Sequence, residues 1–370
     1  MLRTVRFSYV HIAFFLNILC GHCALLAAEE YRAQPVLSGL NAPWAIEFLD
    51  DDRALVTEKS GRLQLLSLSK QSKTELTGVA EVWYSGQGGL LDVALAPDFQ
   101  ASRELFFTYS KAVDGGVTTA LAKAFWPKNS SQLQRWQDLL VAQATQEGGQ
   151  HFGSRITFDS AGHVLFGIGD RGEREEAQNL LSHAGTILRL NRDGSIPADN
   201  PFVKEPNALP EIWTLGHRNP QGLFFDLRSQ QLWSIEHGPR GGDEINLIER
   251  GRNYGWPIIS YGQEYYAPID VGEKQKAGME QPIKYYVPSI APSSLIRYSG
   301  KAIPQWKGNL LSGALRGKHL NRVEVNAENR AVGEARLFEA LGERIRDIAE
   351  TPNGKLFFIT DSGQLYSIAK

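Results

Sequence analysis

Residues 156–169 read I-T-F-D-S-A-G-H-V-L-F-G-I-G, two apolar segments joined by a turn of small and acidic residues. Apolar runs bounded by turn residues are typical of β-strands, so this stretch predicts a hairpin. The same phrase recurs at five further places, which begin at Trp44, Asp92, Leu223, Ser294 and Asp347, with the weakest copy at Ser294. A unit repeated at this scale predicts the blades of a propeller.

Six copies predict an all-β fold, a six-bladed β-propeller with four-stranded antiparallel blades. Without its first 28 residues the chain offers about 57 residues per blade, enough for four strands and their loops. A generic β sandwich is the alternative, because it produces the same alternation. Helical periodicity is scarce, and residues 173–182 are the best candidate. In a propeller the loops converge around a central channel, so residues far apart in sequence can share one pocket.

The N-terminal segment has the pattern of an export signal. Arg3 and Arg6 precede a mostly apolar run at 12–19, and small residues follow up to Ala28. The run is too short and too interrupted for a transmembrane span. We therefore expect a signal peptide over residues 1–28, a propeller over the remainder to residue 370, and a periplasmic or secreted protein.

The composition is that of an ordinary globular protein. The 370 residues are 42% hydrophobic and 22% charged with a net charge of −2, and no basic block indicates nucleic-acid binding. Both cysteines, Cys20 and Cys23, fall within the expected signal, so the mature chain would have no disulfide. Lipid modification of one of them is an alternative to cleavage near Ala28.

Two loop residues are candidates for acid–base chemistry. His151 precedes a glycine turn and a strand, and an imidazole can act as a general base near neutral pH. Asp170 ends the next apolar strand, and a hairpin over 151–170 could place its carboxylate against the ring. An isolated histidine and a turn aspartate are the alternatives.

Charged residues near other turns are candidates for ligand binding. Arg344 and Arg346 share one face of a strand, and with Arg218 they could bind a ligand with several carboxylates. Ion pairs to Asp347 or Glu350 are the alternative. Next to glycine turns, Asp243 and Glu244 suit a hard cation such as Ca²⁺, with a solvated turn as the alternative. We find no zinc-type spacing, nucleophile elbow or phosphate-binding loop in the sequence.

Together these segments resemble the soluble quinoprotein sugar dehydrogenases, the aldose sugar dehydrogenase (glucose/sorbosone dehydrogenase-like) family. The resemblance runs from about Ala42 to the C-terminus and rests on eight motifs in family order: G-Q-G-G-L-L-D-V-A, H-F-G-S-R, G-I-G-D-R-G, L-R-L-N-R-D-G-S-I-P-A-D-N-P, G-H-R-N-P-Q-G, E-H-G-P-R-G-G-D-E-I-N, N-Y-G-W-P and R-I-R-D. It implies a six-bladed propeller that binds pyrroloquinoline quinone (PQQ) with Ca²⁺ over the channel mouth.

The resemblance also implies a role for individual residues. His151 matches the family's catalytic base, and Asp170 the aspartate beside it. The matches to the quinone contacts are Gln87, Arg218, Asn219, Gln221, Arg344 and Arg346. The backbone carbonyls of Gly238 and Pro239 match those that hold calcium at the cofactor. Glu244 and Tyr254 match a second, structural calcium site.

The sequence departs from the family pattern in two places. Arg316 stands where a lysine usually reaches the quinone, which keeps the charge but changes a point charge into a planar fork. Thr186 replaces another common lysine. The loop between Asp170 and Leu188 is short, which favours the broad-specificity aldose branch.

The function implied is that of an exported quinoprotein oxidoreductase. It would oxidise the anomeric carbon of an aldose to a lactone by hydride transfer to PQQ, with His151 as the general base. Electrons would pass to an acceptor that the sequence does not identify, and the protein would be a monomer or a homodimer. A calcium-dependent propeller lactonase or esterase and a non-catalytic binding propeller are the alternatives.

Overall fold

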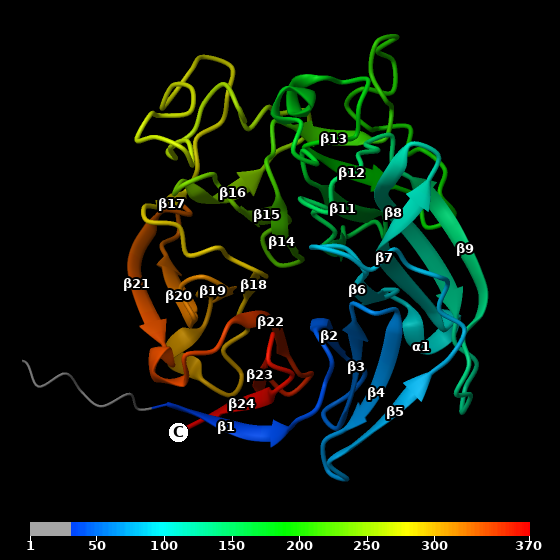
Figure 1. Ribbon diagram of the computed structural model, residues 1–370. Helices are drawn as coiled ribbons and strands as arrows, with labels where there is room; N and C mark the ends of the chain where they lie inside the picture. Colours follow the sequence, from blue (N-terminus) through cyan, green and yellow to red (C-terminus); the bar gives the residue numbers. More distant parts are fainter. Residues whose placement is uncertain (1–30) are drawn as a thin grey trace, which may run out of the picture. The chain divides into compact units, whose positions relative to one another are not determined.

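Six four-stranded antiparallel sheets form residues 31–370, the part of the chain that the computed structural model describes. Figure 1 shows them arranged as a ring. The first three are β2–β5 (Pro43–Phe48, Arg53–Glu58, Arg62–Ser67, Ser72–Leu76), β6–β9 (Leu90–Leu95, Glu104–Val113, Gly116–Phe125, Gln134–Val141) and β10–β13 (Ile156–Phe158, Val164–Ile168, Thr186–Leu190, Ile212–Leu215). The next two are β14–β17 (Pro220–Asp226, Gln231–Glu236, Asp243–Ile248, Lys284–Tyr286) and β18–β21 (Ile296–Arg297, Leu310–Ala314, His319–Val325, Ala331–Leu337).

The sixth sheet joins the two ends of the described chain. It contains β22 (Ile345–Glu350), β23 (Leu356–Thr360), β24 (Leu365–Ala369) and β1 (Arg32–Leu37), and β1 pairs antiparallel with β24. The ring is therefore closed by hydrogen bonds between residues from opposite ends of the sequence. Such closure leaves only short sheet edges exposed.

The six repeated phrases of the sequence coincide with the first two strands of the six sheets. The copy at 156–169 forms β10 and β11, and its counterparts form β2–β3, β6–β7, β14–β15, β18–β19 and β22–β23. The prediction of a six-bladed propeller with four-stranded antiparallel blades is confirmed, and the β-sandwich alternative is wrong.

The core lies between neighbouring blades, which explains why the middle strands are apolar on both faces. Every residue of β11, Val-Leu-Phe-Gly-Ile, is buried. Phe106 of β7 and Phe166 of β11 belong to one buried cluster, although they lie in different blades. Each sheet thus packs against two others, and the ring has no free apolar face at these strands.

One buried arginine connects all six blades near the axis of the ring. Arg155 directly precedes β10, and its guanidinium contacts one group from each of the other five blades: Trp44, Asp92, Gln221, Ser293 and Asp347. The two carboxylates lie 2.9 and 3.0 Å from its Nη1. Because Asp347 also accepts the backbone N–H of Ile46, the network reaches the first blade twice.

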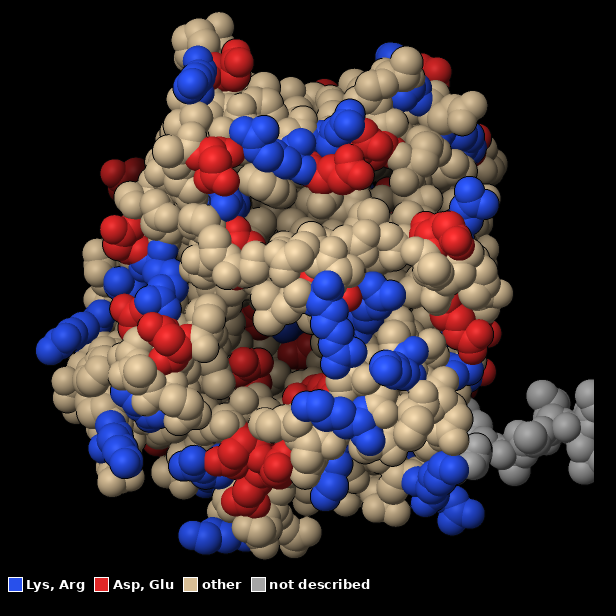
Figure 2. Space-filling view, turned by 180° about the vertical axis from the view of Figure 1, so that it is seen from behind, with Lys and Arg blue, Asp and Glu red and all other residues tan. Residues whose placement is uncertain are grey.

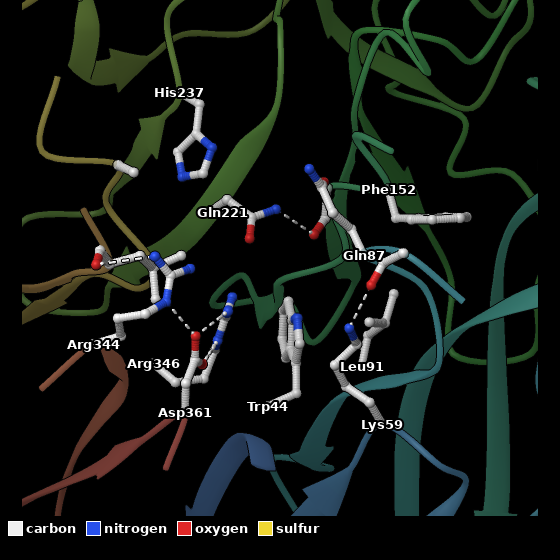
Figure 3. Close-up of a pocket in the computed structure, with 14 residues that line it drawn as sticks. Trp44, Lys59, Gln87, Leu91, Phe152, Gln221, His237, Arg344, Arg346 and Asp361 are labelled. Carbon is white, nitrogen blue, oxygen red and sulfur yellow. Dashed lines mark hydrogen bonds and ion pairs between the residues drawn. The ribbon is translucent and has the colours of Figure 1, made fainter. Parts of the chain in front are cut away.

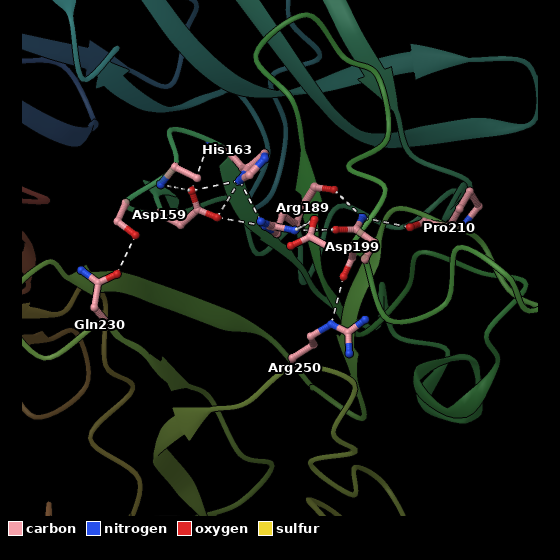
Figure 4. Close-up of polar contacts among 10 residues, drawn as sticks. Asp159, His163, Arg189, Asp199, Pro210, Gln230 and Arg250 are labelled. Carbon is pink, nitrogen blue, oxygen red and sulfur yellow. Dashed lines mark hydrogen bonds and ion pairs between the residues drawn. The ribbon is translucent and has the colours of Figure 1, made fainter.

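A second, purely structural network supports the third blade (Figure 4). Arg189 of β12 donates to Asp159 at 2.9 Å and to Asp199 at 2.8 Å, and Asp159 also binds His163. Asp199 belongs to the motif L-R-L-N-R-D-G-S-I-P-A-D-N-P, as does Arg189. We therefore infer that this motif stabilises the third blade.

The helices are short: α1 (Phe99–Ser102) and the 3₁₀ turns η1 (Arg174–Gln178), η2 (Pro304–Trp306) and η3 (Glu339–Leu341). The expected helix over 173–182 is reduced to η1. In residues 31–370 no helix is long and apolar enough to cross a membrane. The expected signal peptide over 1–28 lies outside the described residues.

Candidate active site

A cavity of about 340 Å³ is lined by residues from widely separated parts of the sequence (Figure 3). Its apolar walls include Trp44, Leu91, Phe152 and Leu315. Its polar side chains are Lys59, Gln87, Gln221, His237, Arg344, Arg346 and Asp361. Three cations against one carboxylate make the cavity electropositive, so it suits a ligand with several anionic groups.

His151 and Asp170 meet beside the cavity, as the hairpin between them predicts; neither residue lines it, whereas Phe152, which follows His151, does. His151 Nδ1 lies 2.5 Å from Asp170 Oδ1, and the backbone N–H of His151 donates to Gln87 Oε1 at 2.9 Å. The backbone of His151 is left-handed, with φ of 51°. Because Nδ1 is engaged, Nε2 is the nitrogen left open, and it has no hydrogen-bond partner among residues 31–370.

The surroundings of this pair keep the imidazole neutral and the carboxylate charged. Burial lowers the pKa of His151, the charges of Arg218 and Arg171 act in the same direction, and Asp170 opposes them. Burial alone would raise the pKa of Asp170, but hydrogen bonds from His151 and the N–H of Gly172 hold that pKa below its usual range. A neutral imidazole oriented by a carboxylate is the arrangement a general base needs.

Arg344 and Arg346 face the cavity from β22 and the residue before it. Both pair with Asp361, at 2.7 Å for Arg344 and 2.8 Å for Arg346. The expected alternative partners are wrong, because Asp347 is engaged by Arg155, and Glu350 accepts hydrogen bonds from Ser299. Sequence reasoning missed Asp361, although the β22–β23 hairpin could have located it: Asp361 follows Thr360 of β23, which pairs with Ile345 of β22.

Lys59 is a cavity cation that sequence reasoning missed. It follows β3, and its ammonium donates to the carbonyl of Gly86 at 2.7 Å. Burial lowers the pKa of Lys59, and the charge of Arg346 adds to the effect. Lys59 faces the cavity together with Arg346 and has no ion pair with a carboxylate among residues 31–370, which favours an anion between the two cations.

The G-H-R-N-P-Q-G stretch divides into a residue at the cavity and residues behind it. Gln221 lines the cavity, and its Nε2 donates to the carbonyl of Gly153 and to Asn219 Oδ1. Asn219 is completely buried and accepts the N–H of Gly153, so its position is that of a support for Gln221. Arg218 is buried nearby, and its Nε has no partner among the described residues.

His237 is a second histidine at the cavity that sequence reasoning passed over, although it lies within E-H-G-P-R. Burial lowers its pKa to about 3, aided by the charges of Arg218 and Arg346. It is therefore neutral, and its Nε2 lies 2.7 Å from the carbonyl of Pro292. Arg316, the expected quinone contact in place of a lysine, is exposed on the turn after β19, next to the cavity-lining Leu315, and is not itself one of the residues that line the cavity.

A very small cavity of about 10 Å³ lies next to Arg218 and His237. Glu244 and Tyr254, both expected at the structural calcium site, line it together with Glu236 and with Gly238, one of the two residues expected to hold calcium at the cofactor. The fourth, Pro239, uses its carbonyl to accept the hydroxyl of Tyr265 at 3.1 Å. Among residues 31–370 no group of three or more His, Cys, Asp or Glu could hold a metal, so a cation here would depend on backbone oxygens.

The two glutamates at this small cavity lie opposite each other on paired strands. Glu236 of β15 is in register with Glu244 of β16. Burial raises the pKa of Glu244 to about 8, and the neighbouring Glu236 adds to the shift. The hydroxyl of Tyr254 is fully engaged by Leu247 and Glu249, which leaves only its backbone oxygen for a cation.

A second cavity, on the face of the molecule that Figure 2 shows, is acidic, in contrast to the electropositive cavity described above. Acidic side chains gather there in a hollow near the middle of the view. Glu47, Asp92, Asp347 and Glu350 line a cavity of about 260 Å³ beside Arg155. Burial raises the pKa of Glu47 to about 8. The electropositive cavity is therefore separated from an acidic one by the Arg155 network.

Comparison with known proteins agrees with the fold and with the motifs. The Glucose / Sorbosone dehydrogenase family matches residues 40–367 of this chain. The chain is 39% identical over 364 residues to the aldose sugar dehydrogenase YliI of Escherichia coli (strain K12), covering 96% of this chain and 98% of that one.

Two solved structures extend the comparison. The apo form of the soluble aldose sugar dehydrogenase from Escherichia coli is 37% identical with a TM-score of 0.88, covering 92% of this chain and 99% of that one. The PQQ-bound form of the aldose sugar dehydrogenase from Streptomyces coelicolor is 25% identical with a TM-score of 0.78, covering 91% and 97%. The chain therefore belongs to the glucose/sorbosone dehydrogenase family.

Proposed function

We propose that this protein is a PQQ-dependent aldose sugar dehydrogenase that acts in the periplasm or outside the cell. The observation that carries the proposal is a neutral, carboxylate-oriented histidine with a free Nε2 next to an electropositive cavity. Relatives that are aldose sugar dehydrogenases support an oxidoreductase acting on sugars. A relative with bound PQQ supports the cofactor.

The cavity residues fit PQQ, a flat quinone that carries three carboxylates. Lys59, Arg344 and Arg346 supply positive charge, and Trp44 and Phe152 supply flat apolar surface. The buried, unpartnered Nε of Arg218 is a further donor nearby. Gln87 and Gln221 would add amide hydrogen bonds at the walls, whereas Asn219 would act through Gln221.

His151 would remove the proton from the anomeric hydroxyl of the sugar through Nε2. Asp170 would keep Nδ1 as the protonated nitrogen and stabilise the charged ring that forms. When bound, PQQ would supply the acceptor for the hydride that leaves C1. The arginines and Lys59 would stabilise the negative charge that develops on the anion they bind. The product would be a lactone.

The small cavity fits a calcium ion in its donor chemistry. Glu244 and the backbone oxygen of Tyr254, the residues expected at the structural calcium site, are hard oxygen ligands, which Ca²⁺ prefers. Gly238, which is expected to hold the calcium at the cofactor together with Pro239, lines the same cavity. A cation would also relieve the repulsion between Glu244 and the facing Glu236. A metal bound there would lie beside Arg218 and His237, close to the proposed cofactor site.

A lactonase or esterase would place a metal held by carboxylates and amides in the middle of the propeller. The cavity at His151 carries three cations, which favours an anionic cofactor over such a metal. A non-catalytic binding propeller would not need the ordered His151–Asp170 pair.

Reconstitution tests the proposal. Purified apoprotein is mixed with PQQ and Ca²⁺, and an aldose is then added with a dye as electron acceptor. We expect PQQ to bind and the dye to be reduced only when all components are present. Absence of PQQ binding would overturn the proposal.

A further inference from the structure

We propose that Trp256 is a positioning residue for the reaction, because its indole N–H fixes the carboxylate that orients His151. Trp256 Nε1 lies 2.8 Å from Asp170 Oδ2. The inference rests on the proposed function, in which His151 is the base. It adds a third member to the His151–Asp170 pair, from a loop 86 residues further along the chain.

The hydrogen bonds of Asp170 show what the indole contributes. Oδ1 accepts from His151 Nδ1 at 2.5 Å and from the N–H of Gly172 at 2.8 Å, whereas Oδ2 accepts from Trp256. Both oxygens are therefore fixed, and the carboxylate cannot turn about its bond to Cβ. Without the indole, Oδ1 would still accept two hydrogen bonds, but Oδ2 would lose its donor, so the plane of the carboxylate would be less firmly fixed.

Trp256 is itself held rigidly. Its side chain is buried in a cluster with Ala177 and Val271. Its backbone N–H donates to Gly216 at 2.9 Å, and its carbonyl accepts the amide of Gln178 at 2.7 Å. A donor fixed at both ends of its residue can position an acceptor more accurately than a mobile side chain.

The charged groups around the pair act independently of the indole. His151 faces Asp170, Arg218 and Arg171, which all influence its pKa. The guanidinium carbons of Arg218 and Arg174 lie 5.3 and 5.6 Å from the ring centroid of Trp256. Replacing the indole by a phenyl ring keeps an aromatic face for both arginines and removes only the donor to Asp170 and part of the ring.

Loss of the indole N–H should change the pKa of His151 in one direction. Asp170 then keeps more negative charge for His151, which favours the protonated imidazole, so the pKa of His151 should rise. A carboxylate with a donor to only one of its oxygens also holds the imidazole less well in its reactive orientation. We expect kcat to fall on the order of fivefold, the value of one ordinary hydrogen bond, with KM for the sugar unchanged.

The test compares Trp256→Phe with Trp233→Phe. Trp233 is also fully buried, and its Nε1 has no hydrogen-bond partner in the described part of the chain. The pKa of His151 is measured by NMR titration of each apoprotein, and kcat and KM are measured after reconstitution with PQQ and Ca²⁺. We expect Trp256→Phe to raise that pKa and lower kcat, and Trp233→Phe to change neither.

Unchanged titration of His151 and unchanged kcat in folded Trp256→Phe would overturn the inference. A measurement on the unsubstituted protein covers the case in which the variant does not fold. In that protein, the chemical shift of the Trp256 indole N–H should change as His151 titrates, whereas that of Trp233 should not. A Trp256 chemical shift that does not change during the titration would overturn the inference. The titrations need neither sugar nor PQQ, so they test the role of Trp256 separately from the proposed function. Failure of the proposed function would be seen instead as turnover by His151→Ala.

Discussion

Arg155→Met removes the one charge that contacts all six blades. Methionine keeps most of the buried stem beside Trp44 but none of the donors. Asp92 and Asp347 then remain buried without their cation, and two backbone carbonyls lose a donor. Breaking a buried ion pair on one side costs about 3–5 kcal/mol, so we expect a loss of about 4 kcal/mol in the free energy of unfolding.

The loss of stability in Arg155→Met should be larger at high pH than at low pH. Burial already raises the pKa of Asp92 to about 6, against the attraction of Arg155, and it also raises the pKa of Asp347. A carboxyl with a raised folded pKa weakens the folded state as pH rises from its unfolded pKa towards the folded one. Without Arg155 both folded values rise further, so the variant should lose more stability at pH 8 than at pH 5.

Equilibrium denaturation in urea at pH 5 and pH 8 measures both effects. Arg53→Met is the control, since Arg53 pairs with Asp50 at the surface, with side chains 54% and 41% exposed, and should cost under about 1 kcal/mol. Adding Asp92→Asn and Asp347→Asn to Arg155→Met should restore part of the loss. A loss of unfolding free energy in Arg155→Met no larger than that of the control, or a larger loss at pH 5 than at pH 8, would contradict this prediction.

Two further changes test the proposed binding sites. Arg346→Ala should weaken PQQ binding by about tenfold or more, because one charged hydrogen-bond donor is lost from the cavity, whereas exposed Arg330→Ala should not; equal PQQ affinities by fluorescence titration would contradict this. Glu244→Gln should abolish the rise in Tm that Ca²⁺ gives the unsubstituted protein, because a carboxylate ligand is lost, yet leave the calcium-free protein at least as stable, because an amide avoids ionisation at a position where burial raises the pKa of Glu244 to about 8. A rise in Tm with Ca²⁺ equal to that of the unsubstituted protein would rule out this metal site.

The sequence predicts those parts of the fold that depend on neighbouring residues. Each blade begins with a hairpin whose two strands adjoin in the chain, so alternation and turn residues were enough to locate β10 and β11 and their five counterparts. The same locality made the meeting of His151 and Asp170 predictable, because one hairpin joins them.

Contacts between blades left no comparable signal. Trp256 meets Asp170 only because the third and fourth blades are neighbours, and no spacing in the chain encodes that contact. Asp361 is different, because it ends the β22–β23 hairpin and is brought beside both cavity arginines by the pairing of Ile345 with Thr360. Arg155 is the last residue of H-F-G-S-R, yet its six-blade contacts depend on the central position of that residue. The predicted ion pairs of Arg344 and Arg346 with Asp347 or Glu350 failed for the same reason, since near neighbours in sequence were engaged by other blades.

The central claim is that His151 takes a proton from the sugar beside a bound quinone. The most direct measurement loads the protein and His151→Ala with PQQ and Ca²⁺, confirms equal cofactor binding, and follows the quinone absorbance after one addition of aldose without a second acceptor. We expect rapid bleaching in the unsubstituted protein and a rate lower by at least about a hundredfold in His151→Ala. Bleaching of His151→Ala at a near-normal rate would contradict it.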